Sequence, residues 1–334
     1  MLLPTSYGAT VLTLVLAALF WGAWANTQRA DRKWRFEFYA FDFALGAIAM
    51  ALLLAMTLGN AGSSNSFTFE DGMTVASKRN IATAFGGGTI FCLGNVMILA
   101  GVALAGMSTA LPVAVGIALV TAVAGGAIGG APTNGVLVYA GAGAALAALL
   151  AAAMAQKEAA FAAPVKKGMH PGWKGFILSC VGGVFVGISL PVVESSRGGD
   201  VGVGAYGAVV FMAFGMLAMT PLVNLFFLNL PVQGDAASPL GYLKGTKGQH
   251  ILGILGGAIW GAGTMAFFAA ADGAFAGAPK FLGNEALAYG GAVVGALCGL
   301  SIWGEQAGAP KAKVMLLGTM VLLAGGAAMV FMGA

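Results

Sequence analysis

Three residues near the N-terminus combine two indole rings with an amide, a set that could bind a small polar solute. Trp21, Trp24 and Gln28 are spaced i, i+3 and i+7, so they share one face if the segment is helical. An indole face stacks on a sugar ring or a planar heterocycle, and an amide hydrogen-bonds hydroxyl or urea groups. We therefore expect solute binding here, although tryptophans near the end of a membrane span also form an interfacial belt.

Further candidates for solute binding lie within other apolar stretches. Asn95 is in mid-stretch beside Gly94, and an amide in hydrocarbon is costly unless it is hydrogen-bonded. It therefore either joins two helices or faces a wet cavity. Trp260, which is flanked by glycines, is either a cavity wall or a packing ring. Thr264 and Asn284 complete the candidate binding set.

Three carboxylates are candidates for carrying a coupling proton, because acids inside a membrane are rare and usually functional. Glu285 begins the apolar stretch 281–303, where an acid either enters a cavity or complements the helix dipole. Glu194 has the same two interpretations. Asp42 lies one turn into its stretch, and its structural interpretation is an ion pair with Arg35 or another nearby base.

No residue pattern indicates an enzyme, a metal site or a cofactor site. The cysteines, Cys92, Cys180 and Cys298, lie far apart in apolar stretches and have no metal-binding spacing. The two histidines, His170 and His250, form no cluster in the sequence. There is no catalytic triad motif or phosphate-binding loop. Nucleic acid is not expected as a partner because no extended basic face is present.

The composition requires that these residues sit in a membrane protein. Only 8% of the 334 residues are charged, and the mean hydropathy is +0.90, whereas soluble domains contain about 25% charged residues. Ten apolar stretches are long enough to cross a bilayer. They are 6–27, 38–58, 80–103, 108–129, 134–155, 174–193, 203–228, 249–271, 281–303 and 312–332. Very short breaks at 105–107 and 130–133 predict tight hairpins.

The ten spans predict an all-α fold made of two five-helix repeats. A shift of 169 residues pairs Gly88 with Gly257, and a shift of 165 pairs Phe20-Trp21-Gly22 with Phe185-Val186-Gly187. The first shift also aligns Phe91 with Trp260 and Asn95 with Thr264. Five is an odd number, so the halves must be inverted relative to each other. The expected units are a first repeat, a connector and a second repeat, at 1–155, 156–173 and 174–334.

The basic residues predict the orientation in the membrane. Loops after odd-numbered spans carry 12 of the 16 lysines and arginines, and Glu305 is expected at this exit with Lys311 and Lys313 as neighbours. The positive-inside rule places these loops in the cytoplasm and both termini outside. We expect a multi-pass protein of the bacterial inner membrane, as a monomer or homodimer.

Four short segments resemble the drug/metabolite transporter superfamily, in the branch of rhamnose–proton symporters, glucose/ribose porters and ureide permeases. They are Phe20-Trp-Gly-Ala-Trp24, Lys33-Trp34-Arg-Phe-Glu37 leading to Asp42, Gly94-Asn95 followed by Ala105-Gly106-Met107-Ser108, and Trp303-Gly304-Glu305. The resemblance implies ten spans around a central cavity that opens alternately to each side. It also implies uptake of a small neutral polar solute with protons. Its usual pattern places both termini inside, contrary to the charge count.

These observations predict a secondary transporter and no enzyme. The first expectation is proton-coupled symport of a monosaccharide by alternating access, without a cofactor and with sodium as the other possible coupling ion. The alternative solute is a ureide or nucleobase such as allantoin or uracil. Both solute classes need aromatic faces and amide groups, so the sequence does not separate them.

Overall fold

The computed structural model describes residues 1–61, 68–129, 133–165, 168–273 and 280–334, and these contain helices and no strand. Ten spans are long and apolar enough to cross a membrane, which confirms the predicted all-α class. The elements are α1 Tyr7–Ala23, α2 Ala25–Ala30, α3 Phe36–Thr57, α4 Phe69–Val75, α5 Lys78–Ala105, α6 Met107–Gly129, α7 Gly135–Ala162, α8 Pro171–Ser195, α9 Gly204–Asn229, η1 Pro239–Lys244, α10 Lys247–Ala271, α11 Phe281–Tyr289, α12 Gly291–Ser301 and α13 Pro310–Gly333.

The predicted spans agree with the helices to within a few residues except at 134–155, where α7 continues to Ala162. The break at 105–107 is the expected tight hairpin, because Gly106 adopts a positive φ of 83° between α5 and α6. The break at 130–133 lies mostly outside the described residues. Two spans each consist of two helices, α1 and α2 joined at Trp24 and α11 and α12 joined at Gly290, with helical backbone angles at both joining residues.

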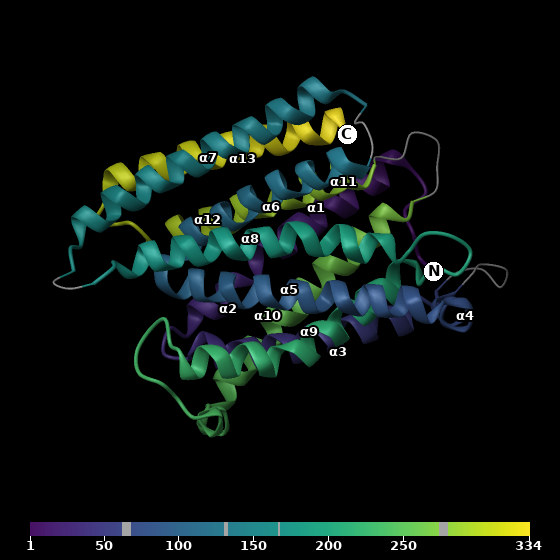
Figure 1. Ribbon diagram of the computed structural model, residues 1–334, viewed down its shortest axis with the longest axis horizontal. Helices are drawn as coiled ribbons and strands as arrows, with labels where there is room; N and C mark the ends of the chain where they lie inside the picture. Colours follow the sequence, from purple (N-terminus) through teal and green to yellow (C-terminus); the bar gives the residue numbers. More distant parts are fainter. Residues whose placement is uncertain (62–67, 130–132, 166–167, 274–279) are drawn as a thin grey trace.

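The long helices run roughly parallel to the longest axis of the molecule (Figure 1). α7 and α13 pack against each other along one side, while α3, α9 and α10 form the opposite side. Both termini lie at the same end, as ten spans require, and α4 lies near that end too. We call it the terminal end. The opposite end carries the basic loops that follow the odd-numbered spans, and we call it the basic end.

The helix packing has an approximate twofold symmetry that relates the two halves of the chain. α5 packs on α8 just as α1 packs on α10, and α3 packs on α10 just as α9 packs on α5. α6 contacts α8 and α7 in the way that α11 and α12 contact α1 and α13. Helices of one half therefore lie between helices of the other, so the central seam is built from both repeats.

Glycines show that the symmetry holds residue by residue. A Cβ atom on Gly88 would collide with the carbonyl oxygen of Met212, and one on Gly257 would collide with that of Phe43. Both pairs are related by the shift of 169 residues. The second shift holds as well, since Gly94 meets Gly182 and Phe185 where Gly263 meets Ala17 and Phe20. Backbone-to-backbone contact at these glycines therefore fixes the same helix crossings in both halves.

Candidate functional site

A small pocket lies at the seam between the two halves, with a volume of about 60 Å³. Its walls come from α1, α5, α6, α8, α10, α11 and α12, with Trp24 between α1 and α2. The lining residues are Trp21, Trp24, Phe91, Asn95, Ile98, Leu111, Ala114, Val115, Val186, Leu190, Trp260, Tyr289 and Ala292. Sites for small molecules usually enclose about 300–1,000 Å³. The central pocket is therefore smaller than a typical solute site and has space for a few water molecules.

The rings of Phe91 and Trp260 stack in the wall of the central pocket. Their centroids are 4.5 Å apart and their planes are 27° from parallel. The two residues occupy equivalent positions in the two repeats, so the symmetry axis passes close to this stack. Trp260 therefore packs against another ring and also forms part of the pocket wall, so both interpretations of this residue from the sequence apply.

Asn95 lies one helical turn from Phe91, and its side chain is 5% exposed. Its amide has no hydrogen-bond partner among the described residues, and it lines the central pocket. The indole nitrogens of Trp24 and Trp260 also have no partner within that part of the chain, and both rings line the pocket. The central pocket therefore offers one amide and two N–H donors to a solute, surrounded by aromatic faces.

Other polar groups around the central pocket are already paired. The Trp21 indole donates a hydrogen bond of 3.1 Å to Oγ1 of Thr264, whose hydroxyl donates in turn to the carbonyl of Trp260. Thr264 therefore orients the Trp21 ring and is not in the pocket wall. Trp21 also lies beside Tyr289, with centroids 6.0 Å apart.

Glu285 is connected to the central pocket through Tyr289. The Tyr289 hydroxyl donates a hydrogen bond of 2.6 Å to Oε1 of Glu285, and the ring of Tyr289 lines the pocket. Glu285 is 1% exposed and has no ion-pair partner among the described residues. Asn284 is buried next to it. This carboxyl group is therefore one hydrogen bond away from the pocket wall.

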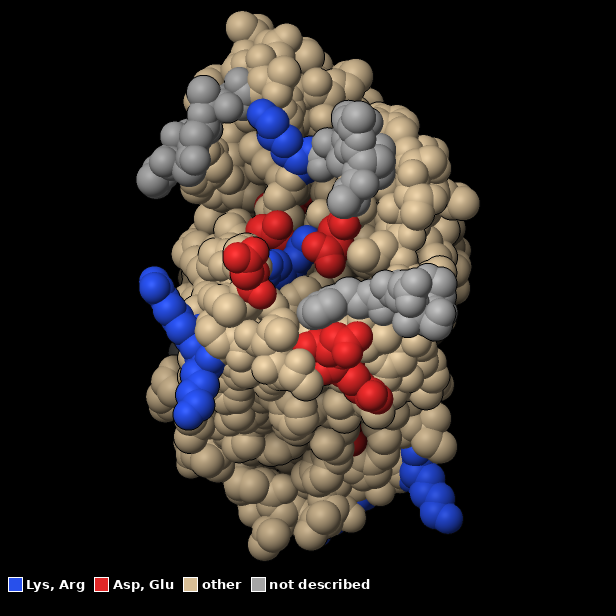
Figure 2. Space-filling view, turned by 90° about the vertical axis from the view of Figure 1, so that its right-hand side faces the viewer, with Lys and Arg blue, Asp and Glu red and all other residues tan. Residues whose placement is uncertain are grey.

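Glu194 belongs to an ion-pair cluster at the terminal end. Arg197 lies 2.7 Å from Glu194 and 2.7 Å from Asp272, and its guanidinium packs against the ring of Phe268. Figure 2 shows basic atoms at the bottom of a hollow on this end of the molecule, with acidic side chains around them. Glu194 is thus tied to a cation, unlike Glu285.

Asp42 lies in a hydrogen-bonded cluster toward the basic end, and of the partners expected for it, Arg35 or another base, it pairs with another base, His250. Arg35 pairs with Glu37 instead, at 2.7 Å. The fully buried Asp42 carboxylate accepts hydrogen bonds from Tyr242 at 2.6 Å and from the Trp34 indole at 3.3 Å, and it pairs with His250 at 2.9 Å. These partners come from a loop and from α10, which the sequence does not bring together.

The Asp42 cluster holds the segment between α9 and α10 against α3. Tyr242 lies on η1, and burial together with its hydrogen bond to Asp42 raises the pKa of its phenol above the ordinary value. His250 also joins the cluster, although no His cluster is visible in the sequence. The arrangement favours a structural role for Asp42 over the expected role in proton coupling.

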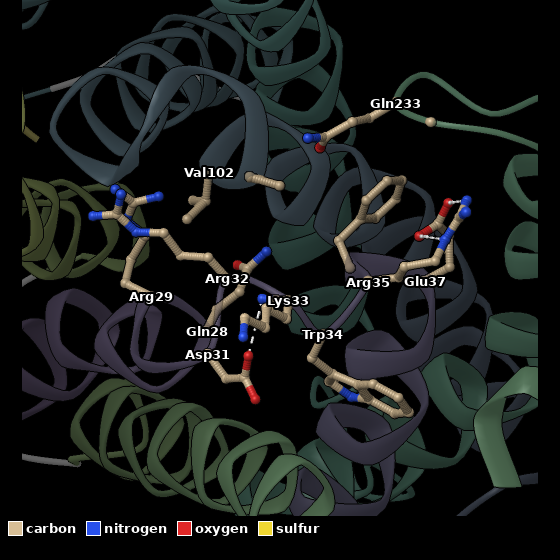
Figure 3. A pocket seen from close by; sticks show the side chains of 13 residues that line it. Gln28, Arg29, Asp31, Arg32, Lys33, Trp34, Arg35, Glu37, Val102 and Gln233 are labelled. Atoms are coloured by element: carbon tan, nitrogen blue, oxygen red, sulfur yellow. Dashed lines mark hydrogen bonds and ion pairs between the residues drawn. The ribbon is translucent and has the colours of Figure 1, made fainter. Parts of the chain in front are cut away.

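A larger hollow of about 400 Å³ opens at the basic end, and we call it the vestibule. Figure 3 shows Gln28, Arg29, Arg32, Lys33 and Trp34 around it. Gln28 was expected on the same binding face as Trp21 and Trp24. It lines the vestibule instead, because it lies one helical turn beyond Trp24 toward the basic end.

Comparisons with known proteins identify the fold and no more. No family model and no curated protein matches the chain. A solved structure described only as the crystal structure of a protein superposes with a TM-score of 0.56 at 14% identity, covering 95% of this chain and 96% of that one. At this identity the similarity shows a shared helical architecture.

Two residues of the site could not be selected from the sequence. Tyr289 is one of six tyrosines, and nothing in its spacing singles it out except its position one turn after Glu285. His250 lies at the start of a span beside a polar loop, so it resembles an ordinary interfacial residue. Tyr289 lies one helical turn from the acid that it bonds, Glu285. His250 instead reaches its acid, Asp42, from another helix, and the sequence does not show this relation.

Proposed function

We propose that the protein is a secondary transporter that moves a small neutral polar solute by alternating access. One observation carries the proposal: the repeats meet at a pocket with aromatic walls and three polar groups that have no partner in the described chain. These three groups are not among the fully buried unpaired atoms of the described residues, so they are accessible and available to pair with a ligand in the pocket. The stack of Phe91 and Trp260, which are related by the proposed repeat, supports a pocket on the symmetry axis, where inverted-repeat transporters bind their solutes.

The chemistry of the central pocket favours a flat, amide-bearing solute. The free groups are two indole N–H donors and the amide of Asn95, and these match the carbonyl and N–H groups of a ureide or a nucleobase. Trp260 and Phe91 supply flat faces for such a ring. A monosaccharide, our first expectation from the sequence, would bring more hydroxyl groups than the described wall can pair. The ureide or nucleobase alternative is therefore the solute class we propose.

We propose that Glu285 carries the coupling proton. It is buried, it has no cation partner in the described chain, and it reaches the pocket through Tyr289. An unpaired carboxylate in this setting is costly, so a proton stabilises the group and its release requires a rearrangement. Solute binding next to Tyr289 can then change the hydrogen bond and couple the two movements.

The orientation and the family complete the proposal. We place the basic end, with 12 of the 16 lysines and arginines, in the cytoplasm of a bacterial inner membrane, and both termini outside. The aromatic pocket between two five-helix halves supports membership of the drug/metabolite transporter superfamily.

Uptake of labelled uracil into proteoliposomes with an inward proton gradient tests the proposal. We expect saturable accumulation that collapses with a protonophore. Excess allantoin should compete, whereas a monosaccharide should not. Competition by the monosaccharide alone would overturn the solute class. Uptake that follows the solute gradient and ignores the protonophore would overturn proton coupling.

A further inference from the structure

Three segments that are far apart in the sequence meet at one place between the central pocket and the vestibule. They are α2, the hairpin at Gly106 and the segment Trp303-Gly304-Glu305. Neither solute binding nor proton coupling, as proposed above, uses them. The contacts of these segments with α2 are a buried ion pair and a hydrogen bond.

Glu305 joins two of these segments to each other. Its carboxylate accepts hydrogen bonds from the backbone N–H groups of Met107 at 3.1 Å and Ser108 at 2.8 Å, at the start of α6. The same carboxylate lies 2.7 Å from the Arg29 guanidinium, and both side chains are at least nine-tenths buried. Glu305 therefore does not pair with Lys311 or Lys313, which were expected to be its neighbours. It complements the N-terminus of α6 and holds α2 at the same time.

Two further hydrogen bonds hold α2 in place. The Trp303 indole donates to Oδ1 of Asn26 at 2.8 Å, and Nε2 of Gln28 donates to the carbonyl of Leu99 on α5 at 2.8 Å. We call these two bonds and the Arg29–Glu305 pair the α2 clamp. The clamp ties α2 to elements from both halves of the chain.

The position of α2 makes the clamp a barrier. Trp24, immediately before α2, lines the central pocket, whereas Gln28 and Arg29 line the vestibule. On α5, Ile98 lines the pocket and Val102 lines the vestibule, and the carbonyl bonded to Gln28 lies between them at Leu99. The Gln28–Leu99 bond therefore lies between the residues of α5 that line the two cavities.

We propose that α2 is the gate at the basic end, and that the α2 clamp keeps it closed. α2 is the short end of the first span, beyond Trp24, so loss of the clamp interactions frees this end of the span to move. When the clamp opens, the central pocket joins the vestibule and the solute can leave toward the basic end. The inference rests on the proposed transport function, but the geometry that it requires can be tested without any solute.

The terminal end has a counterpart to this clamp. The shift of 165 residues that relates the first and sixth spans places Glu194 at the position of Arg29. Glu194 is also ion-paired, through Arg197, which bridges it to Asp272 at the end of α10. Equivalent positions in the two repeats thus carry charges of opposite sign in ion pairs at opposite ends of the route. This arrangement fits a transporter in which one end opens while the other stays closed.

Thiol labelling tests the gate directly. Ala292 lines the central pocket and is buried, so Ala292→Cys is placed in a chain whose three native cysteines are replaced by alanine. The protein is reconstituted in nanodiscs, and its reaction rate with a small water-soluble thiol reagent is measured. We expect Arg29→Gln and Gln28→Ala each to raise the labelling rate by about tenfold, because each removes an interaction made only in the closed state.

Arg35→Gln is the matched control. It breaks the Arg35–Glu37 pair, which has the same 2.7 Å separation at the same vestibule but does not touch α2. We expect this variant to label at the parent rate. Gln28→Ala leaves the buried ion pair intact, so it remains informative if loss of Arg29 prevents folding. Labelling at the parent rate in folded Gln28→Ala, or equal acceleration by Arg35→Gln, would overturn the gate. Neither result would decide whether the protein transports a solute, because the uptake experiment tests that proposal separately.

Discussion

At the scale of single residues, three amide side chains differ in their hydrogen bonds. Asn224 donates a hydrogen bond of 2.7 Å to the backbone carbonyl of Glu37, and Gln28 donates to Leu99, while the side-chain oxygens of both are buried without a partner in the described chain. Asn95 donates to nothing in the described chain, and it lines the central pocket. Its amide atoms are not among the fully buried unpaired ones, so they are accessible and available to a ligand.

This contrast predicts opposite behaviour for two alanine substitutions. Asn95→Ala should weaken solute binding by at least about tenfold, since it removes a hydrogen bond to the solute worth about 1.4 kcal/mol, with little change in melting temperature. Asn224→Ala should lower the melting temperature and leave the affinity of the folded protein unchanged. Titration calorimetry and thermal unfolding in detergent measure the two quantities. Normal affinity in Asn95→Ala would remove this residue from the site.

Glu285→Gln should separate proton coupling from solute movement. The amide cannot lose a proton, so accumulation driven by a proton gradient should disappear while exchange of labelled for unlabelled solute continues. Asp42→Asn is the comparison, because Asp42 has three hydrogen-bonding partners and a structural role. It should lower stability and keep coupling in the protein that remains folded. If Asp42→Asn gave the uncoupled phenotype, the proton site would lie at the Asp42–His250 pair.

The sequence indicates most of the aromatic pocket but little of its hydrogen bonding. Trp21, Trp24, Asn95 and Trp260 are visible as unusual residues in apolar stretches, and all four line the central pocket. The hydrogen-bond partners could not be predicted in this way, since His250 and Asp42 are 208 positions apart in the chain. Spacing within one helix cannot predict such a contact, because it depends on how two helices are rotated against each other.

At the scale of helices, glycine contacts determine how closely the two halves approach. Gly88 on α5 meets the backbone of α9, and Gly257 on α10 meets the backbone of α3. Gly86 is only two residues from Gly88, yet a Cβ atom there would meet nothing within 4 Å. One helix thus contains a glycine required by packing and a glycine that is not required.

Alanine at these two positions should change stability in opposite directions. Gly88→Ala forces a methyl group against the Met212 carbonyl and should destabilise the fold by about 1–3 kcal/mol. Gly86→Ala should leave stability unchanged or increase it by up to about 1 kcal/mol, because alanine favours helix. Thermal or denaturant unfolding of both variants measures the difference. Equal effects would mean that the contact between α5 and α9 is looser than described.

The helices themselves follow from the length of the apolar stretches, whereas short elements do not. All ten spans were predicted, but α4 and η1 lie in regions that seemed to be polar loops. α4 forms because Thr68 and Asp71 make reciprocal capping hydrogen bonds, a signal that is local and easily overlooked.

At the scale of the whole molecule, the two halves of the chain pack with approximate twofold symmetry around one small pocket. The pseudo-symmetry was predictable because the same shifts align glycines, rings and the Asn95–Thr264 pair. The departures from symmetry are also informative: Glu285, His250 and Asp42 have no acidic or histidine counterpart at the aligned positions. In the proposed transporter, the symmetric parts of the molecule would build the pathway, and the asymmetric polar residues would give the two ends different chemistry.

Transport measured with a tryptophan removed from the seam tests the central claim most directly. Trp260→Ala is compared with Trp173→Ala, since Trp173 packs on Phe176 and is not among the pocket residues. In proteoliposomes, exchange of labelled uracil or allantoin should fall at least about tenfold for Trp260→Ala, because an aromatic stack on the solute is worth about 1–3 kcal/mol. Exchange should stay at the wild-type rate for Trp173→Ala. Undiminished exchange in Trp260→Ala, or no protein-dependent flux of a ureide, a nucleobase or a monosaccharide, would contradict the account.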